Sequence, residues 1–195
     1  MATPTQTPAS AILTDPGYLL ISDIGTAIPT MTVVGSKFTD AWAAGWTVIG
    51  PTLEGNTLAY QLNLTPVYVA EFFDPVLWAP TTRQGSIAMA LANWTLTNLS
   101  KAFNTAVPTV VSGTTTTQLN KLSPPAPTAI VRRQIGWESL DNTLRAVMYQ
   151  TINGGQITSS FKKAPDLAGI PCEFNFELPV ATAMCDFWSA GTGRA

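Results

Sequence analysis

Apolar and polar residues alternate with a period of two in the clearest segments of the chain. From residue 172 to residue 178 every second side chain is apolar. The apolar set is Cys172, Phe174, Phe176 and Leu178, and the polar set is Glu173, Asn175 and Glu177. Successive side chains of a β-strand point to opposite faces, so this pattern predicts a half-buried strand.

The same alternation occupies residues 57–64, where the polar positions are neutral. The apolar set is Leu58, Tyr60, Leu62 and Leu64, and the other set is Thr57, Ala59, Gln61 and Asn63. Thr65-Pro66 punctuates the pattern, and the β-rich residues 67–73 follow. We therefore predict a hairpin of these two segments.

Shorter β-rich segments alternate with turn residues elsewhere. They predict strands at residues 45–49, 85–92, 129–137, 143–151 and 156–161. The last three segments suit a meander with turns at Asp141-Asn142 and Asn153-Gly154, because Asn-Gly tolerates the positive φ of a tight hairpin.

One short helix is predicted after residue 96. Thr97 suits its N-cap, with Leu96 before it as a hydrophobic staple. Leu96, Leu99 and Phe103 form one apolar stripe, and Asn104 suits the C-terminal cap. We expect this stripe to pack on a sheet.

Two stretches are rich in Pro and Thr. We interpret residues 1–17 as an N-terminal arm and residues 18–195 as one β-domain with a long loop at 105–128. Such composition usually means disorder when a segment has no partner. We expect neighbouring copies of the chain to hold the arm and the loop in place.

Charge is scarce in this chain of 195 residues. Only 11% of residues are Asp, Glu, Lys or Arg, against about 25% in an ordinary soluble domain. The hydrophobic share is an ordinary 46%, so neutral polar residues replace the missing charges. Extensive interfaces lose charged residues at their cores, which predicts a subunit of a permanent assembly.

Several functions are disfavoured by composition. The chain has no His, which removes Ser-His-Asp and Cys-His chemistry and most zinc sites. A carboxylate-only glycosidase pair remains conceivable, although the acidic residues are sparse. The net charge of −2 argues against a protein that binds nucleic acid through its phosphates. We expect no catalytic residue, metal or cofactor, two reduced cysteines, and neither a secretory signal nor a membrane span.

Several blocks of sequence, in this order and spacing, resemble the major tail tube proteins of long-tailed phages, especially those that infect actinobacteria. The resemblance covers roughly residues 18–190. Its blocks are DIGTAIPT at 23–30, GWTVIG at 45–50, VAEFFDPV at 69–76, RQGS at 83–86, LA at 91–92, LTNL at 96–99, RRQIGWESLD at 132–141, FKKAPD at 161–166 and IPCEF at 170–174.

The resemblance implies a mostly β fold, with antiparallel sheets packed as a sandwich or partial barrel and one flanking α-helix. It also implies a structural, non-enzymatic subunit of the virion that is assembled in the host cytoplasm. Six copies would form a ring, and stacked rings would form the tube that delivers the genome. Its partners would be itself, the tape measure, tail terminator and tip proteins, and double-stranded DNA in transit without sequence-specific binding.

Two other classes stay open. One is another self-associating virion β-protein, such as a tail terminator or a capsid decoration protein. The other is an enzyme or ligand-binding β-sandwich. Imaging of the purified chain separates tubes or rings from compact multimers and from monomers.

Candidate site residues follow from the matched blocks. The inter-subunit candidates are Glu71, Asp74, Arg83, Arg132, Arg133, Glu138, Asp141 and Arg145. They are interpreted either as solvated strand ends or as pairs that fix the register of a ring. Trp46, Trp137 and Trp188 are either interface anchors or core residues. The lumen candidates are Thr57, Gln61 and Asn63 with Glu71 nearby, and the alternative lumen face is Glu173, Asn175 and Glu177.

Overall fold

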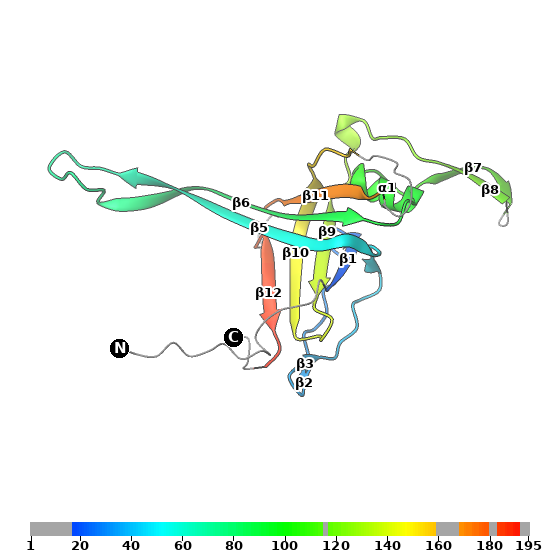
Figure 1. The fold of residues 1–195 in the computed structure, drawn as a ribbon, viewed down its shortest axis with the longest axis horizontal. Coiled ribbons are helices and arrows are strands. Elements are labelled where there is room, and N and C mark those ends of the chain that lie inside the picture. Colours follow the sequence, from blue (N-terminus) through cyan, green and yellow to red (C-terminus); the bar gives the residue numbers. More distant parts are fainter. Residues whose placement is uncertain (1–16, 115–116, 159–167, 180–182, 192–195) are drawn as a thin grey trace. The chain divides into compact units, whose positions relative to one another are not determined.

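The computed structural model describes residues 17–114, 117–158, 168–179 and 183–191. The described part of the chain is mostly β, with 50% strand and 6% helix, and its sheets are antiparallel (Figure 1). Within the described residues there is one α-helix and no closed barrel. The expected mostly β, antiparallel fold with one helix is confirmed, whereas the N-terminal arm lies outside the described residues apart from Gly17.

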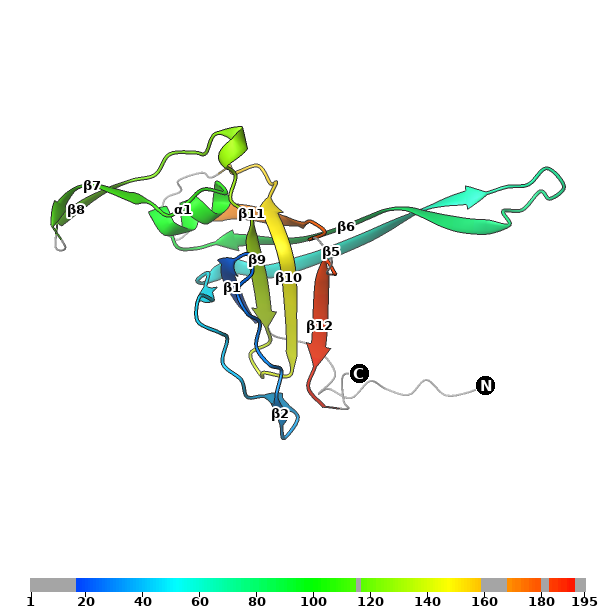
Figure 2. The same cartoon turned by 180° about the vertical axis from the view of Figure 1, so that it is seen from behind.

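The chain divides into two compact units, and each is assembled from separate segments of sequence. Unit 1 contains residues 1–51, 130–151 and 177–195, and unit 2 contains residues 52–129 and 152–176. Figure 2 shows their elements from behind. The single β-domain from residue 18 to residue 195 stays a prediction.

Unit 1 contains a five-stranded antiparallel array. Its order is β4 (Thr47–Val48), β1 (Tyr18–Asp23), β9 (Arg133–Glu138), β10 (Leu144–Asn153) and β12 (Cys185–Ser189). The last two residues of β10 belong to unit 2. A small hairpin of β2 (Val33–Val34) and β3 (Lys37–Phe38) completes the strands. The strands predicted at 45–49, 129–137 and 143–151 are confirmed with shifted bounds.

The core of unit 1 explains why β1 was not predicted. Leu19, Leu20 and Ile21 are all buried, so both faces of β1 are covered and its residues do not alternate. Trp46 is buried with Leu20, and its Nε1 donates a hydrogen bond to the Ala27 carbonyl oxygen at 2.9 Å. Of the two interpretations of Trp46, interface anchor or core residue, the structure therefore supports the core residue.

The two turns predicted beside β10 have different outcomes. Asn142 lies in the turn between β9 and β10 with φ of 57°, as the sequence predicts. After Asn153-Gly154, however, residues 156–158 form no strand, and 159–161 lie outside the described residues. The predicted third strand of the meander is therefore wrong over 156–158. Within unit 1 the second partner of β10 is β12 instead.

Unit 2 contains a three-stranded antiparallel array of β11 (Ile170–Phe176), β6 (Leu77–Leu91) and β5 (Thr52–Val67). In β11 Phe174 is buried and Glu173 is exposed, which confirms the predicted alternation over 172–176. The strand ends at Phe176, and the prediction that Leu178 shares the buried face is wrong because Leu178 is exposed. β5 does not stop at Thr65-Pro66, and its partner is β6 rather than residues 67–73. A proline is tolerated there because β5 is the last strand in the sheet order, and an edge strand needs fewer hydrogen-bond donors.

The helix of unit 2 begins earlier than predicted. α1 (Leu96–Ala102) has Thr95 as its N-cap, with the side chain accepting a hydrogen bond from the Asn98 amide, so the assignment of Thr97 is wrong. The predicted apolar stripe is also wrong, because Leu96 is exposed. The residues that the helix buries are Asn98, Ser100, Lys101 and Ala102.

The C-terminal end of α1 confirms the role of Asn104. Its φ is 51°, and its amide donates to the Lys101 carbonyl while the Thr105 amide donates to the Ser100 carbonyl, which is a Schellman motif. The Asn104 side chain also exchanges two hydrogen bonds of 2.7 and 2.8 Å with the Asn153 backbone. The Asn153 side-chain Oδ1 in turn accepts a hydrogen bond of 2.7 Å from the Glu173 backbone N–H, so the helix end is joined to β11.

The long loop predicted at 105–128 contains regular structure. β7 (Thr109–Thr114) and β8 (Thr117–Lys121) pair as an antiparallel hairpin, and a short 3₁₀ helix spans Pro127–Ala129. The Thr and Val residues of this segment are β-branched and favour strands, which outweighs its disorder-prone composition.

Candidate assembly surface

The ladder between β5 and β6 separates their side chains into a neutral polar face and a face that is mostly apolar, with Arg83 opposite Leu62 as its charged residue. On the polar face Thr57 lies opposite Ala88, and Gln61 lies opposite Gln84. Directly opposite residues of an antiparallel pair share a face. The β5 and β6 members of this face are Thr57, Ala59, Gln61, Asn63, Thr82, Gln84, Ser86 and Ala88.

β11 extends the same face. Glu173 lies opposite Ala88 and Asn175 lies opposite Ser86. The two alternative lumen faces of the sequence analysis are therefore one face, with the exception of Glu177, which lies in unit 1. We call the eight β5 and β6 residues together with Glu173 and Asn175 the amide face. Sequence alone could not join them, because the strand register decides which residues meet.

The amide face is hollowed and almost uncharged. A hollow of about 520 Å³ is lined by residues of all three strands, including Gln61, Gln84 and Asn175. A second, of about 360 Å³, is lined by residues including Thr57. Glu173 lines both hollows and is the only charged residue in either lining. Gln61 Nε2 donates to Asn63 Oδ1 at 2.8 Å, so neighbouring amides satisfy one another.

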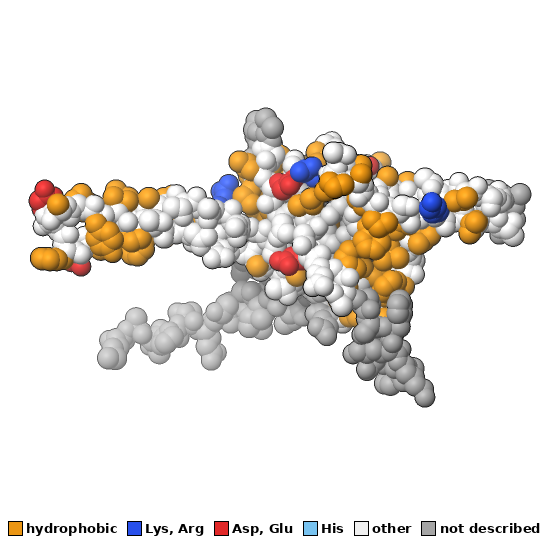
Figure 3. Space-filling view, turned by 90° about the horizontal axis from the view of Figure 1, so that it is seen from above, with side chains coloured by type: hydrophobic (Ala, Val, Ile, Leu, Met, Phe, Trp, Pro, Cys, Tyr) orange, Lys and Arg blue, Asp and Glu red, His pale blue; other side chains and the backbone are white. Residues whose placement is uncertain are grey.

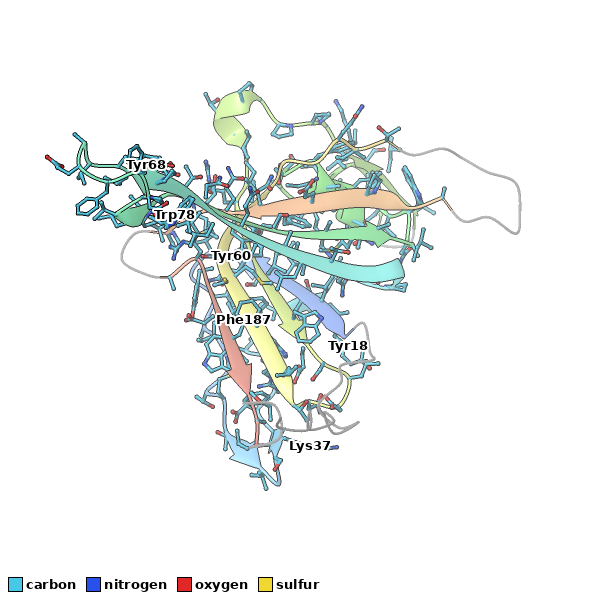
Figure 4. The ribbon with its side chains drawn as sticks, turned by 60° about the vertical axis from the view of Figure 1, so that its left-hand side comes forward. Tyr18, Lys37, Tyr60, Tyr68, Trp78 and Phe187 are labelled. Atoms are coloured by element: carbon cyan, nitrogen blue, oxygen red, sulfur yellow. The ribbon has the colours of Figure 1, made fainter. Side chains whose placement is uncertain are left out.

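The opposite face of the hairpin is an exposed apolar stripe. Four alternate side chains of β5 are between 46% and 60% exposed, and Trp78 of β6 is 56% exposed. We call this set the apolar stripe: Leu58, Tyr60, Leu62, Leu64 and Trp78. Figure 4 shows Tyr60 and Trp78 on this hairpin. A contiguous exposed apolar patch marks an interaction site in a soluble protein.

A β-bulge divides the hairpin into two parts. Asn63 lies opposite Thr82, but Leu64 lies opposite Pro80, so Thr81 is the extra residue. The Thr81 hydroxyl donates to the Asn63 carbonyl at 3.1 Å. Before the bulge lies the amide face.

Beyond the bulge the hairpin ends in residues 68–76, which we call the hairpin tip. Phe73 is fully exposed there, and Tyr68 and Phe72 are largely exposed. Glu71 and Asp74 also lie in the tip. The structure therefore places Glu71 outside the amide face, unlike the three other lumen candidates.

Glu138 and Arg145 lie inside unit 1. Arg145 is opposite Glu138 in the β9–β10 ladder, and its Nη2 lies 2.6 Å from Glu138 Oε1. Trp42 Nε1 donates to Glu138 Oε2 at 2.5 Å, and the Arg145 guanidinium stacks 4.9 Å from the centre of the Phe38 ring. Arg145 is 3% exposed. Both side chains are buried, so the solvated strand-end interpretation is wrong for this pair, whereas the inter-subunit interpretation stays a prediction.

The remaining charged candidates of unit 1 make internal bonds at strand ends. Arg132 pairs with Glu177 at 2.5 Å, and Arg133 pairs with Asp23 at 2.9 Å. Burial raises the pKa of Glu177, but hydrogen bonds from Arg132 and Gln150 outweigh it and hold the pKa below its usual value. Asp141 accepts hydrogen bonds from Ser139 and Thr143 in the β9–β10 turn.

Three of the eight inter-subunit candidates belong to the β5–β6 hairpin. Glu71, Asp74 and Arg83 are exposed, and none makes an ion pair with another described residue. The exposed candidates without an ion pair thus gather on the element that also carries the apolar stripe, whereas Arg132 is exposed but pairs with Glu177. Exposure of these residues depends on the fold, so no signal in the sequence separated them from the other five.

No protein-family model matches the chain, and no curated protein sequence matches it. In the part of the chain that the structure describes, no cluster of three or more His, Cys, Asp or Glu side chains is placed to hold a metal ion. No helix among the described residues is long and apolar enough to cross a membrane.

Proposed function

We propose that this protein is a non-catalytic structural subunit that assembles with copies of itself into a hollow tube. The β5–β6 hairpin carries the proposal, because one of its faces is neutral and polar while the other is an exposed apolar stripe. A strand with such faces is suited to a wall between an aqueous bore and a packed exterior. The tube we propose is a phage tail tube, as the resemblance of the sequence implies.

The free edge of β5 supports assembly through strands. β5 is 16 residues long and ends the sheet order among the described strands. Long exposed edges are templates for pairing with another chain, and closure into a barrel removes them. Copies joined through such edges would form a barrel with the amide face inward. The apolar stripe would then be covered by neighbouring protein.

The chemistry of the amide face suits a conduit for nucleic acid. Tight, sequence-independent binding of DNA relies on Lys and Arg that neutralise its phosphates, and the amide face has neither. Its only charge is Glu173, which repels phosphate. Double-stranded DNA could therefore pass without being held, and tape measure, terminator and tip proteins would be the further partners of such a tube.

Electron microscopy of the concentrated, purified chain tests the proposal. We expect rings or hollow tubes, and isolated monomers at every concentration would contradict it. Cysteine labelling distinguishes the two faces in a Cys185→Ser background. The adjacent variants Gln61→Cys and Leu62→Cys should both react with a small maleimide in the dissociated chain. After assembly Gln61→Cys should stay reactive and Leu62→Cys should become protected. Equal reactivity in the tube would contradict the assignment of the faces.

A further inference from the structure

The β7–β8 hairpin is an element without cover in the described chain. Every described side chain from Thr109 to Lys121 is exposed, and Val110, Val111 and Leu119 are each more than half exposed. An isolated two-stranded hairpin is marginally stable in water. A partner that covers these β-branched and apolar side chains would therefore stabilise the hairpin.

The hairpin tip of β5–β6 has complementary character. It offers large exposed aromatic rings, Phe72 and Phe73, and the carboxylates of Glu71 and Asp74. The only charged residue of the β7–β8 hairpin is Lys121, at the end of β8. Figure 3 shows acidic and hydrophobic side chains at the end of one hairpin, and basic and hydrophobic side chains on the other.

Within one copy these two surfaces do not meet. The tip joins β5 to the first residue of β6, Leu77, whereas α1 and β7 follow its last residue, Leu91. A strand rises about 3.3 Å per residue, so the 15 residues of β6 separate its two ends by about 45 Å. Figures 1 and 2 agree in showing the β5–β6 tip far from β7 and β8, which are elements of the same unit.

We propose that the hairpin tip of one copy docks on the β7–β8 hairpin of another copy, with Glu71 and Asp74 facing Lys121. The aromatic rings of the tip cover the Val and Leu side chains, and the opposite charges set the orientation. The contact joins two different surfaces, so it is head-to-tail and continues from copy to copy until a ring closes or a filament grows. This inference rests on the self-assembly proposed above and names the surfaces that meet.

Charge reversal with rescue tests the contact. The first variant is Glu71→Lys with Asp74→Lys, the second is Lys121→Glu, and the third combines all three substitutions. We expect each of the first two to raise the concentration needed for assembly at least about tenfold at low salt, where exposed charges are least screened. The combined variant should return to within about threefold of the unmodified chain. Light scattering measures assembly, and circular dichroism checks that each variant is folded.

Lys37→Glu is the matched control, because Lys37 is also an exposed lysine of a small β-hairpin. It should not change assembly, and it should not rescue the tip variant. Rescue by Lys37→Glu as effective as that by Lys121→Glu would overturn the contact.

The two proposals fail in different ways. Tubes or rings that assemble independently of the tip and Lys121 charges would overturn this contact and leave the proposed function standing. Sedimentation that shows charge-coupled dimers without rings or tubes would support the contact and count against the tube. Binding to phosphatidylcholine vesicles that Phe73→Ala abolishes, with assembly unchanged, would make lipid the occupant of the tip and overturn the contact.

Discussion

Unit 1 and the hairpins of unit 2 differ in which side chains they bury: unit 1 buries charged side chains, and the hairpins expose apolar ones. Unit 1 buries a charged pair, Glu138 and Arg145, and covers it with Trp42 and Phe38. The β5–β6 hairpin exposes Tyr60 and the rest of the apolar stripe to solvent. A buried charge needs its partners within the fold, whereas an exposed apolar stripe needs a partner outside it.

This contrast shows which surfaces are short of charged residues. A shortage of Asp, Glu, Lys and Arg spread evenly over the surface would reveal little about function. Here the amide face has one carboxylate and the β7–β8 hairpin has one lysine. Two of the surfaces for which we propose a role in assembly thus carry a single charge each, whereas the hairpin tip carries the carboxylates of Glu71 and Asp74.

The largest effect is expected from a pair of phenylalanines in unit 2. Phe174 is 1% exposed and Phe73 is fully exposed. Phe174→Ala should lower the free energy of unfolding by about 4 kcal/mol, because it leaves a cavity in a packed core. Phe73→Ala should change it by less than about 0.5 kcal/mol but weaken assembly. Urea denaturation of the dissociated chain measures the first effect and light scattering the second. Equal losses of stability would break the comparison.

A smaller effect is expected from the arginines of unit 1. Arg145→Met should cost about 3 kcal/mol, because it leaves the Glu138 carboxylate buried without its partner. The matched variant Arg132→Met removes a partly exposed pair with Glu177 and should cost at most about 1 kcal/mol. Urea denaturation compares the two. If Arg145→Met unfolds no more easily than Arg132→Met, the buried pair does not hold unit 1 together.

The smallest effect expected is a loss of folding stability at alkaline pH. One titrating group in each unit contributes to it. Burial raises the pKa of the Cys172 thiol, in unit 2, to about 12. Burial and the hydrogen bond to Asp186 raise the pKa of Tyr149, in unit 1, to about 12. A raised pKa means that each group stabilises the fold below its ordinary pKa, and this contribution is lost as pH rises toward 12.

Stability should therefore decline from about pH 9 upward, since an unfolded thiol titrates near 8.5. Cys172→Val should make this decline shallower from about pH 9 to pH 12, and Tyr149→Phe should do so only above about pH 10. Urea denaturation at several pH values measures the slope, with Cys185→Val as the control. A decline that neither substitution alters would assign the alkaline instability to other groups.

Local pattern predicted those elements whose burial follows their own sequence. β11 alternates because one of its faces is buried, and Asn104 ends a helix because it tolerates positive φ. The sequence pattern did not predict β1, because this strand is buried on both faces and its residues do not alternate. The length of β5 was missed because Pro66 marks a turn in most contexts, whereas on an edge strand it is tolerated.

The candidate surface was only partly predictable, for reasons of long-range pairing. Thr57, Gln61 and Glu173 were each singled out, but only the register through β6 places them on one face. Glu138 and Arg145 look like ordinary strand-end charges in sequence. Their burial depends on Phe38 and Trp42, about a hundred positions away in the chain, and no local pattern carries that information.

The bulge at Thr81 also determines how the length of this chain can vary. Between Thr82 and Leu91, inserting or deleting one residue would exchange the two faces of β6 and bring Gln84 or Ser86 toward the core. Only changes of two residues keep that segment's pattern. On the other side of the bulge, an added residue lengthens the tip without rotating the amide face. Natural variants of this protein should therefore tolerate changes of length in the hairpin tip, residues 68–76, better than over 82–91.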